Sequence, residues 1–205
     1  PQADVPGCNP TRGFLHHLDA TFNRVTVDGD TSTNDTLIGL ANGASGVRAE
    51  DDDLIVLEEA LTGVLGDLAY MLVKDGEGAT KVMHITVSGA ATDADADAVA
   101  RTVGHSQLVK TAMFGRDPNW GRIVAAAGRA GVAFRPEDLR VTLCGVELFR
   151  DGRPTDLDFD ALLKEPLAGT DVALELILGT GPGSSKLLAS DLSHAYVSLN
   201  ADYRS

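Results

Sequence analysis

The feature that most constrains the fold is a run of leucines and valines between residues 54 and 72. Its apolar residues recur at steps of three and four positions: Leu54, Leu57, Leu61, Val64, Leu65, Leu68 and Leu72. That spacing gathers them on one face of an α-helix. The acidic run "EDDD" directly before them can cap the helix and suits the positive end of its dipole. The pattern therefore predicts a long amphipathic helix.

The segments after this helix alternate between strand-like and helix-like patterns. Met83, Ile85 and Val87 alternate as in a strand, "ATDADADAVARTVG" predicts a second helix, and "LRVTLCGVELF" predicts two strands around a hairpin turn at Gly145. "DFDALLKEPL" predicts a short helix that ends at Pro166, and "TDVALELILGTGPGSSKLLASDL" predicts two strands joined by a Gly-rich hairpin turn. This order favours one mixed α/β (α+β) unit, a largely antiparallel sheet with helices packed on its face.

The composition narrows the class of protein. The 205 residues are 43% hydrophobic, which is enough for a real core. No apolar run is long enough to span a bilayer, and the N-terminal residues do not resemble a signal peptide, so we expect a soluble, cytoplasmic protein without a membrane partner. A net charge of −13 disfavours a nucleic-acid partner. Cys8 and Cys144 predict unpaired thiols, because two distant cysteines make neither a disulfide framework nor a zinc site.

The stretch "FNRVTVDGDTSTNDT" (22–36) is unusually rich in hydrogen-bonding side chains. Four of its residues alternate like the first ligands of an EF-hand: Asp28, Asp30, Ser32 and Asn34. Thr33 then stands where the EF-hand needs Gly, and Gly39 where it needs Glu, so calcium binding is disfavoured. Two alternatives remain open: a solvated loop, or a segment that lines a polar pocket and is held by its own hydrogen bonds.

Three further segments carry candidate chemistry. Glu77 in "DGEGATK" lies between two glycines, either in a simple helix-end turn or as an anchor for an ammonium group. "KTAMFGRDPNWGR" favours a structural turn with Trp120 as a hydrophobic plug. The tail "DLSHAYVSLNADYRS" crowds polar residues at the chain end and favours a strand. No catalytic triad is predicted around His194 in that tail.

Taken together, the polar stretch, "DGEGATK", "KTAMFGRDPNWGR" and the tail resemble the C-terminal, or β, chain of the ornithine acetyltransferases of arginine biosynthesis, also called bifunctional glutamate N-acetyltransferases. The resemblance runs from about Thr21 to Ser205. It divides the chain into an atypical N-terminal segment, 1–20, and a β-chain domain, 21–205. It also implies an N-terminal-nucleophile-like fold.

The resemblance implies a mechanism and partners. Such proteins are made as a precursor that cleaves itself before a threonine, whose hydroxyl becomes the nucleophile and whose α-amino group becomes the general base. The acetyl group of N-acetylornithine passes through this threonine to glutamate, and in some members acetyl-CoA is a second donor. No metal or other cofactor is implied. The partner is the α chain of the same precursor, which carries the oxyanion donors, in an α2β2 heterotetramer.

The resemblance also implies substrate-binding residues. Glu77, Asn200 and the terminal Ser205 match the family's substrate-binding positions. Such a set suits a zwitterionic amino acid, because an anion can bind its ammonium group and neutral donors its carboxylate. The polar stretch is then expected to brace the pocket.

The first twenty residues depart from the family pattern. A family β chain opens with the nucleophilic Thr, then a strand and an apolar-striped helix, whereas this sequence opens "PQADVPGCNPTRGFLHHLDA". Thr11 follows Pro10 and has no free amine, so no catalytic residue is assigned to this chain. A misjoined N-terminus, a nucleophile outside this sequence and a divergent member that lost catalysis all remain open. A Pro1 amine acting as a base is disfavoured, and an inactive assembly partner is the non-enzyme alternative.

Overall fold

The computed structural model describes residues 17–203, which belong to two compact units. Of these, residues 17–24 and 30–69 form the first unit, and residues 25–29 and 70–203 form the second. The sequence predicts one unit, and the division falls within the long helix. That helix, α2 (Asp52–Lys74), is confirmed, with Asp52 and Asp53 in its first turn. Among the described residues, no helix has both the length and the apolar character needed to cross a membrane.

The first unit has little secondary structure besides α2. A short 3-10 helix, η1 (Phe22–Arg24), precedes the unit boundary, and residues 30–51 contain no helix or strand. His17 ties two parts of the unit together: its carbonyl accepts from the Thr21 hydroxyl at 2.6 Å, and its Nδ1 lies 2.8 Å from the Thr62 hydroxyl. Only Leu65 and Ala69 are buried apolar side chains among the described residues of this unit.

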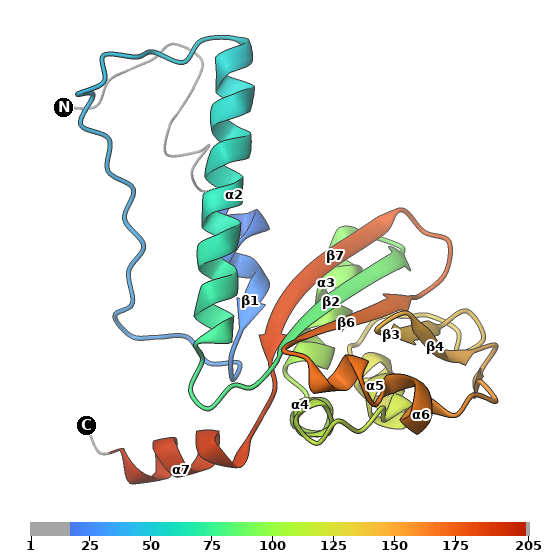
Figure 1. Cartoon of the computed structure of the whole chain (residues 1–205). Coiled ribbons are helices and arrows are strands. Elements are labelled where there is room, and N and C mark those ends of the chain that lie inside the picture. Colours follow the sequence, from blue (N-terminus) through green and yellow to red (C-terminus); the bar gives the residue numbers. More distant parts are fainter. Residues whose placement is uncertain (1–16, 204–205) are drawn as a thin grey trace. The chain divides into compact units, whose positions relative to one another are not determined.

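The second unit is built on a seven-stranded sheet (Figure 1). In spatial order its strands are β1 (Val25–Thr26), β7 (Gly183–Ser190), β2 (Val82–Ala90), β6 (Asp171–Ile177), β3 (Arg140–Leu143), β4 (Val146–Arg150) and β5 (Arg153–Pro154). Strands β1 and β7, and β2 and β6, pair in parallel; the other neighbours are antiparallel. The predicted largely antiparallel sheet is therefore confirmed.

One predicted hairpin is confirmed and the other is wrong. Strands β3 and β4 meet at Cys144 and Gly145, whose φ angles of 47° and 81° are those of a tight two-residue hairpin turn. Strands β6 and β7 do not pair, because β2 lies between them (Figure 1). The glycine-rich run instead crosses the end of β2, where Gly181 N donates to Gly89 O at 3.1 Å. Its glycines allow this close backbone approach, since a Cβ on Gly181 would collide with Ala90.

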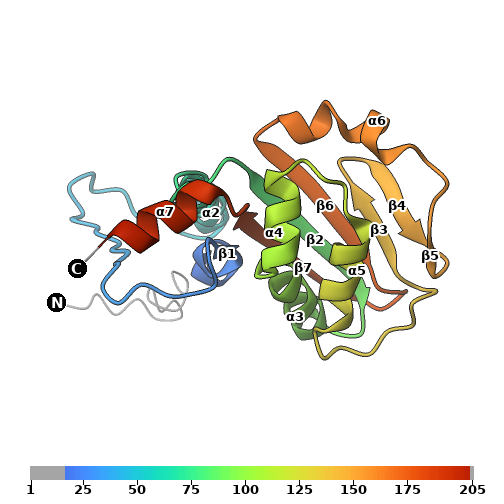
Figure 2. The same ribbon diagram turned by 90° about the horizontal axis from the view of Figure 1, so that it is seen from below.

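Three helices cover one face of the sheet: α3 (Asp93–Gly104), α4 (Gln107–Phe114) and α5 (Trp120–Gly128) (Figure 2). The sequence predicts only the first of them. On the sheet face that these helices cover, alternate residues of β2 and β6 are buried: Met83, Ile85, Val87, Val172, Leu174 and Leu176. A short helix, α6 (Phe159–Leu163), follows β5, so the predicted helix is confirmed; it ends at Leu163, and Pro166 begins the 3-10 helix η2 (Pro166–Ala168).

The C-terminal tail is a helix, α7 (His194–Asp202), so the predicted strand is wrong. Ser193 caps it, because its hydroxyl oxygen accepts from Tyr196 N at 3.3 Å. The apolar alternation of Val197 and Leu199 does not reflect burial, since both side chains are exposed. The local capping bond therefore decides the conformation of this segment, and the period-two pattern does not.

Candidate functional site

Glu77 and Asn200 lie 123 residues apart in sequence and are in direct contact. Glu77 is on the loop between α2 and β2, and Asn200 is on α7. The Asn200 side-chain amide donates to Glu77 Oε2 at 2.6 Å and to Tyr196 O at 3.0 Å. Both side chains are exposed, so a ligand can reach them. The structure thus brings together two of the three residues that the family resemblance singles out; Ser205 lies outside the described residues.

Asp191 fixes the loop that carries Glu77. It follows β7 directly and is buried, with 3% of its surface exposed. Its Oδ1 accepts from Thr80 N at 2.8 Å and Lys81 N at 3.0 Å, and its Oδ2 accepts from the Thr80 hydroxyl. Three donors on one carboxylate hold the end of the loop against the chain that leads into α7. The same residue therefore positions the segments that present Glu77 and Asn200.

Ser193 and Gly78 make the second link between the loop and α7. The Ser193 hydroxyl donates to Gly78 O at 2.6 Å while its oxygen caps α7. Gly78 has a φ of +66°, a left-handed conformation that favours glycine. A Cβ at this position would come within 2.5 Å of Tyr196 N. The second glycine of "DGEGATK" is thus needed both for its backbone conformation and for the close approach of α7.

Part of the polar stretch braces this arrangement. The Tyr196 hydroxyl donates to Asp28 Oδ2 at 3.0 Å. The Lys110 ammonium donates to Val27 O at 2.6 Å, to Ser190 O and to Ser190 Oγ at 3.2 Å. All three of its N–H bonds therefore have acceptors. Burial lowers the pKa of Lys110 to about 8, and the nearby Asp191 and Asp28 carboxylates oppose this shift.

The rest of the polar stretch, residues 30–36, lies in the first unit and is exposed. It is held by local bonds: Ser32 Oγ accepts from Asp35 N at 3.0 Å, and the Thr36 hydroxyl donates to Asn34 O at 3.1 Å. Within residues 17–203, no group of three or more His, Cys, Asp or Glu side chains is arranged to hold a metal ion. Residues 30–36 therefore form an exposed loop held by local bonds, whereas Val27 and Asp28 bond to Lys110 and Tyr196; that this end lines a pocket stays a prediction.

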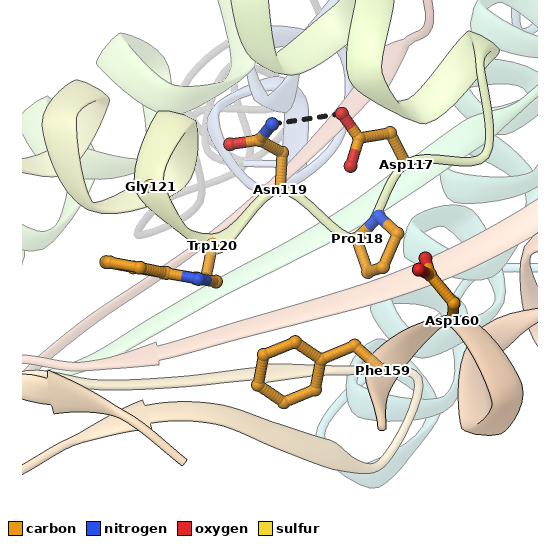
Figure 3. A pocket seen from close by; sticks show the side chains of 7 residues that line it. All are labelled: Asp117, Pro118, Asn119, Trp120, Gly121, Phe159 and Asp160. Atoms are coloured by element: carbon orange, nitrogen blue, oxygen red, sulfur yellow. Dashed lines mark hydrogen bonds between the residues drawn. The ribbon is translucent and has the colours of Figure 1, made fainter. Parts of the chain in front are cut away.

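A separate hollow of about 330 Å³ lies in the second unit (Figure 3). It is lined by Asp117, Pro118, Asn119, Trp120, Gly121, Phe159 and Asp160. Asn119 Oδ1 accepts from Arg122 N and caps α5, while its amide donates to Asp117 at 2.9 Å. The Trp120 ring stacks on Phe149, with 5.7 Å between ring centroids. These contacts confirm the predicted structural turn with Trp120 as a plug, and the hollow contains neither Glu77 nor Asn200.

Several residues that build the site escape the sequence analysis. Asp191, Ser193 and Thr80 lie inside the quoted segments, but only their long-range bonds reveal their role. Ser193 offers the one usable signal, since a serine before a helix is a common N-cap. His194 packs edge-on against Phe114, with ring centroids 5.5 Å apart. Cys144 is a free thiol, as predicted, whereas Cys8, Pro1 and Thr11 lie outside the described residues.

Comparison with known proteins gives these contacts a context. The family model described as "ArgJ family" matches residues 8–205. The chain belongs to the ArgJ family. It is 72% identical over 194 residues to the arginine biosynthesis bifunctional protein ArgJ of Nitratidesulfovibrio vulgaris, covering 95% of this chain and 49% of that protein. The ArgJ protein of Thermosynechococcus vestitus is 46% identical, covering 90% of this chain and 48% of that protein.

A solved structure agrees with this assignment. The crystal structure of the Bacillus halodurans arginine biosynthesis bifunctional protein ArgJ superposes with a TM-score of 0.89 at 34% identity, covering 98% of this chain and 96% of that chain. The family resemblance and the mixed α/β fold class are therefore confirmed. The ArgJ match includes residues 8–20, part of the segment set apart as atypical. The chain spans about half the length of the curated relatives it matches.

Proposed function

We propose that this chain is the β chain of an ornithine acetyltransferase, which moves an acetyl group from N-acetylornithine to glutamate. The observation that carries the proposal is the contact between Glu77 and Asn200, held by Asp191 and Ser193. A carboxylate and a primary amide at one exposed point offer the two kinds of group that a zwitterionic amino acid requires. Names of relatives as bifunctional arginine-biosynthesis proteins support the reaction class.

The two side chains have distinct parts in this proposal. Glu77 accepts from Asn200 through Oε2, which leaves Oε1 available for the ammonium group of the substrate. The Asn200 amide has two N–H bonds, one to Glu77 and one to Tyr196 O, and a substrate carboxylate would take over one of these donors. The positive ammonium group of the substrate would neutralise the negative charge of Glu77. Substrate binding therefore replaces a hydrogen bond of the Asn200 amide with one to the substrate carboxylate.

The chemical step uses a threonine that this sequence does not supply. Its hydroxyl attacks the acetyl carbonyl of N-acetylornithine, the amide C–N bond breaks, and ornithine leaves with the proton on its nitrogen. The amine of glutamate then attacks the acetyl ester, which releases the threonine and yields N-acetylglutamate. No redox change occurs, and acetyl-CoA is a possible alternative donor.

The partner in this proposal is an α chain. The curated relatives are about twice as long as the matched region, whereas the Bacillus halodurans chain is covered to 96%. Chains of both lengths in one family support cleavage of a longer precursor into two. We propose that two such pairs form an α2β2 heterotetramer in the cytoplasm.

The test joins this chain, as one polypeptide, to the half of the Nitratidesulfovibrio vulgaris relative that it does not match, so that the precursor can cleave itself before the threonine. With N-acetylornithine labelled in its acetyl group, label should appear in N-acetylglutamate and transiently on the threonine that opens the β chain. Label trapped on any of residues 1–205 would contradict the proposal that the nucleophile lies outside this sequence. A stable complex that transfers no acetyl group would favour the second candidate, an inactive chain that serves only in assembly.

A further inference from the structure

The first unit exposes several large apolar side chains and contributes none to the hydrophobic core cluster. The hydrophobic core cluster contains only residues between Met83 and Ala189, all in the second unit. By contrast, Leu40 is 93% exposed, Val47 is 81% exposed and Ile38 is 68% exposed. Several large exposed apolar side chains on one unit indicate a binding interface.

One part of this surface is a stripe on α2, defined by Leu57, Leu61, Val64 and Leu68. Its steps of four, three and four residues are those of a helix seam that packs against another element. Val64 is 58% exposed and Leu68 is 43% exposed. The buried residues Leu65 and Ala69 lie on the neighbouring face, so the stripe is additional to the packing already present.

The other part is the segment Thr36–Ala41, "TLIGLA". It forms no helix or strand, and among the described residues no backbone hydrogen bond involves it. Backbone N–H and C=O groups without hydrogen-bond partners, next to exposed leucine and isoleucine side chains, are typical of a β-strand whose neighbouring strand is missing. If such a segment adds to the edge of another sheet, its backbone groups form hydrogen bonds with that sheet and its apolar side chains become buried.

We infer that Thr36–Ala41 adds as a β-strand to the polypeptide that makes up the other half of the relatives' length, and that the α2 stripe packs on the same partner. The partner is identified from the length of the relatives: this chain matches 49% of the Nitratidesulfovibrio vulgaris relative, so about half of that protein remains as a polypeptide that can cover this surface. The inference rests on the assembly in the proposed function, but it does not depend on acetyl transfer.

The first experiment measures hydrogen exchange of the full chain, alone and with the unmatched half of the Nitratidesulfovibrio vulgaris relative. Amides of residues 36–41 should exchange at least about 100-fold more slowly in the complex, as expected for ladder hydrogen bonds. Unchanged exchange in a complex that forms would overturn the strand. Ile38→Pro, which removes an N–H, should weaken binding, whereas Ile38→Thr keeps the N–H and a β-branched side chain and should retain most of it.

The second experiment tests the stripe. The double substitution Val64→Asp with Leu68→Asp should weaken the complex by at least about 100-fold, because it would bury two unpaired charges. Ile55→Asp is the matched control: Ile55 is 57% exposed, as Val64 is 58%, but it lies on the opposite face of α2. Equal loss of affinity in both would overturn the stripe. Helical circular dichroism, to which the 23-residue α2 contributes, reports whether the variants remain folded.

Two further outcomes are decisive. If light scattering shows that this chain alone forms a dimer, and the double substitution abolishes it, a second copy covers the stripe and the inference is wrong. Normal acetyl transfer with unaffected binding of the variants would also overturn it, while leaving the proposed function intact. Protected residues 36–41 in the complex, together with a joined precursor that cleaves itself but transfers no acetyl group, would support the inference and refute the proposed function.

Discussion

Asp191 offers a quantitative test of how the site is held, through the substitutions Asp191→Asn and Asp191→Ala. In Asp191→Asn the retained oxygen can still accept from Thr80 N and Lys81 N, and the new amide can donate to the Thr80 hydroxyl. Only charge is lost, so we expect a cost of about 1 kcal/mol. Asp191→Ala removes every acceptor. Lys81 is 4% exposed, so its N–H is left buried without a partner. Since water reaches the exposed Thr80, the total should be about 3 kcal/mol.

The assay is chemical denaturation followed by the fluorescence of Trp120, the one tryptophan in the sequence. A loss of about 3 kcal/mol leaves a domain of ordinary stability folded, so both variants can be measured. Hydrogen exchange at Gly76–Lys81 should accelerate in Asp191→Ala and change little in Asp191→Asn. If the two substitutions cost the same, charge and not hydrogen-bond acceptance holds the loop, and the reasoning is refuted.

Three other substitutions probe the same region. Gly78→Ala should lower the free energy of unfolding by about 3 kcal/mol, because the new Cβ meets the backbone of α7. Gly145→Ala, also at positive φ but with open space around it, should lower it by about 1 kcal/mol. Similar losses for both variants in chemical denaturation would show that the close approach of α7 to Gly78 does not matter. Because the pKa of Lys110 falls from 10.5 to about 8 on folding, the unfolded chain binds more protons between these values and stability rises with pH there. The difference in unfolding free energy between wild type and Lys110→Met should therefore grow, by at most about 3 kcal/mol, and a difference independent of pH would contradict this. In the assembled enzyme, Glu77→Gln should raise KM at least about tenfold with little change in kcat, while Asp75→Asn, two residues away and exposed, leaves both unchanged; a fall in kcat alone would argue against substrate binding by Glu77.

The elements predicted correctly are those whose signal is local. The leucine spacing of α2, the alternation in β2 and the turn at Gly145 are each patterns of a few neighbouring residues, so they can be recognised without knowledge of the tertiary contacts. The failures share a cause. Pairing of β6 with β7 looked local because a glycine-rich turn joins them, yet β2 inserts between them through contacts about 90 residues away in sequence. The alternation in the tail likewise predicted a strand. Because its apolar side chains stay exposed, a strand would gain no burial energy, and the capping hydrogen bond of Ser193 favours the helix.

The sequence by itself determined the amphipathic helix, through the spacing of its apolar residues, and the family, through four segments in the right order. The resemblance to that family in turn singled out Glu77 and Asn200. Only the tertiary structure decided that these two side chains touch, since their contact depends on Asp191 and Ser193 joining segments more than 100 residues apart. It also decided which apolar residues lack a partner. Burial is a property of packing, and the spacing along α2 does not distinguish the buried Leu65 from the exposed Val64.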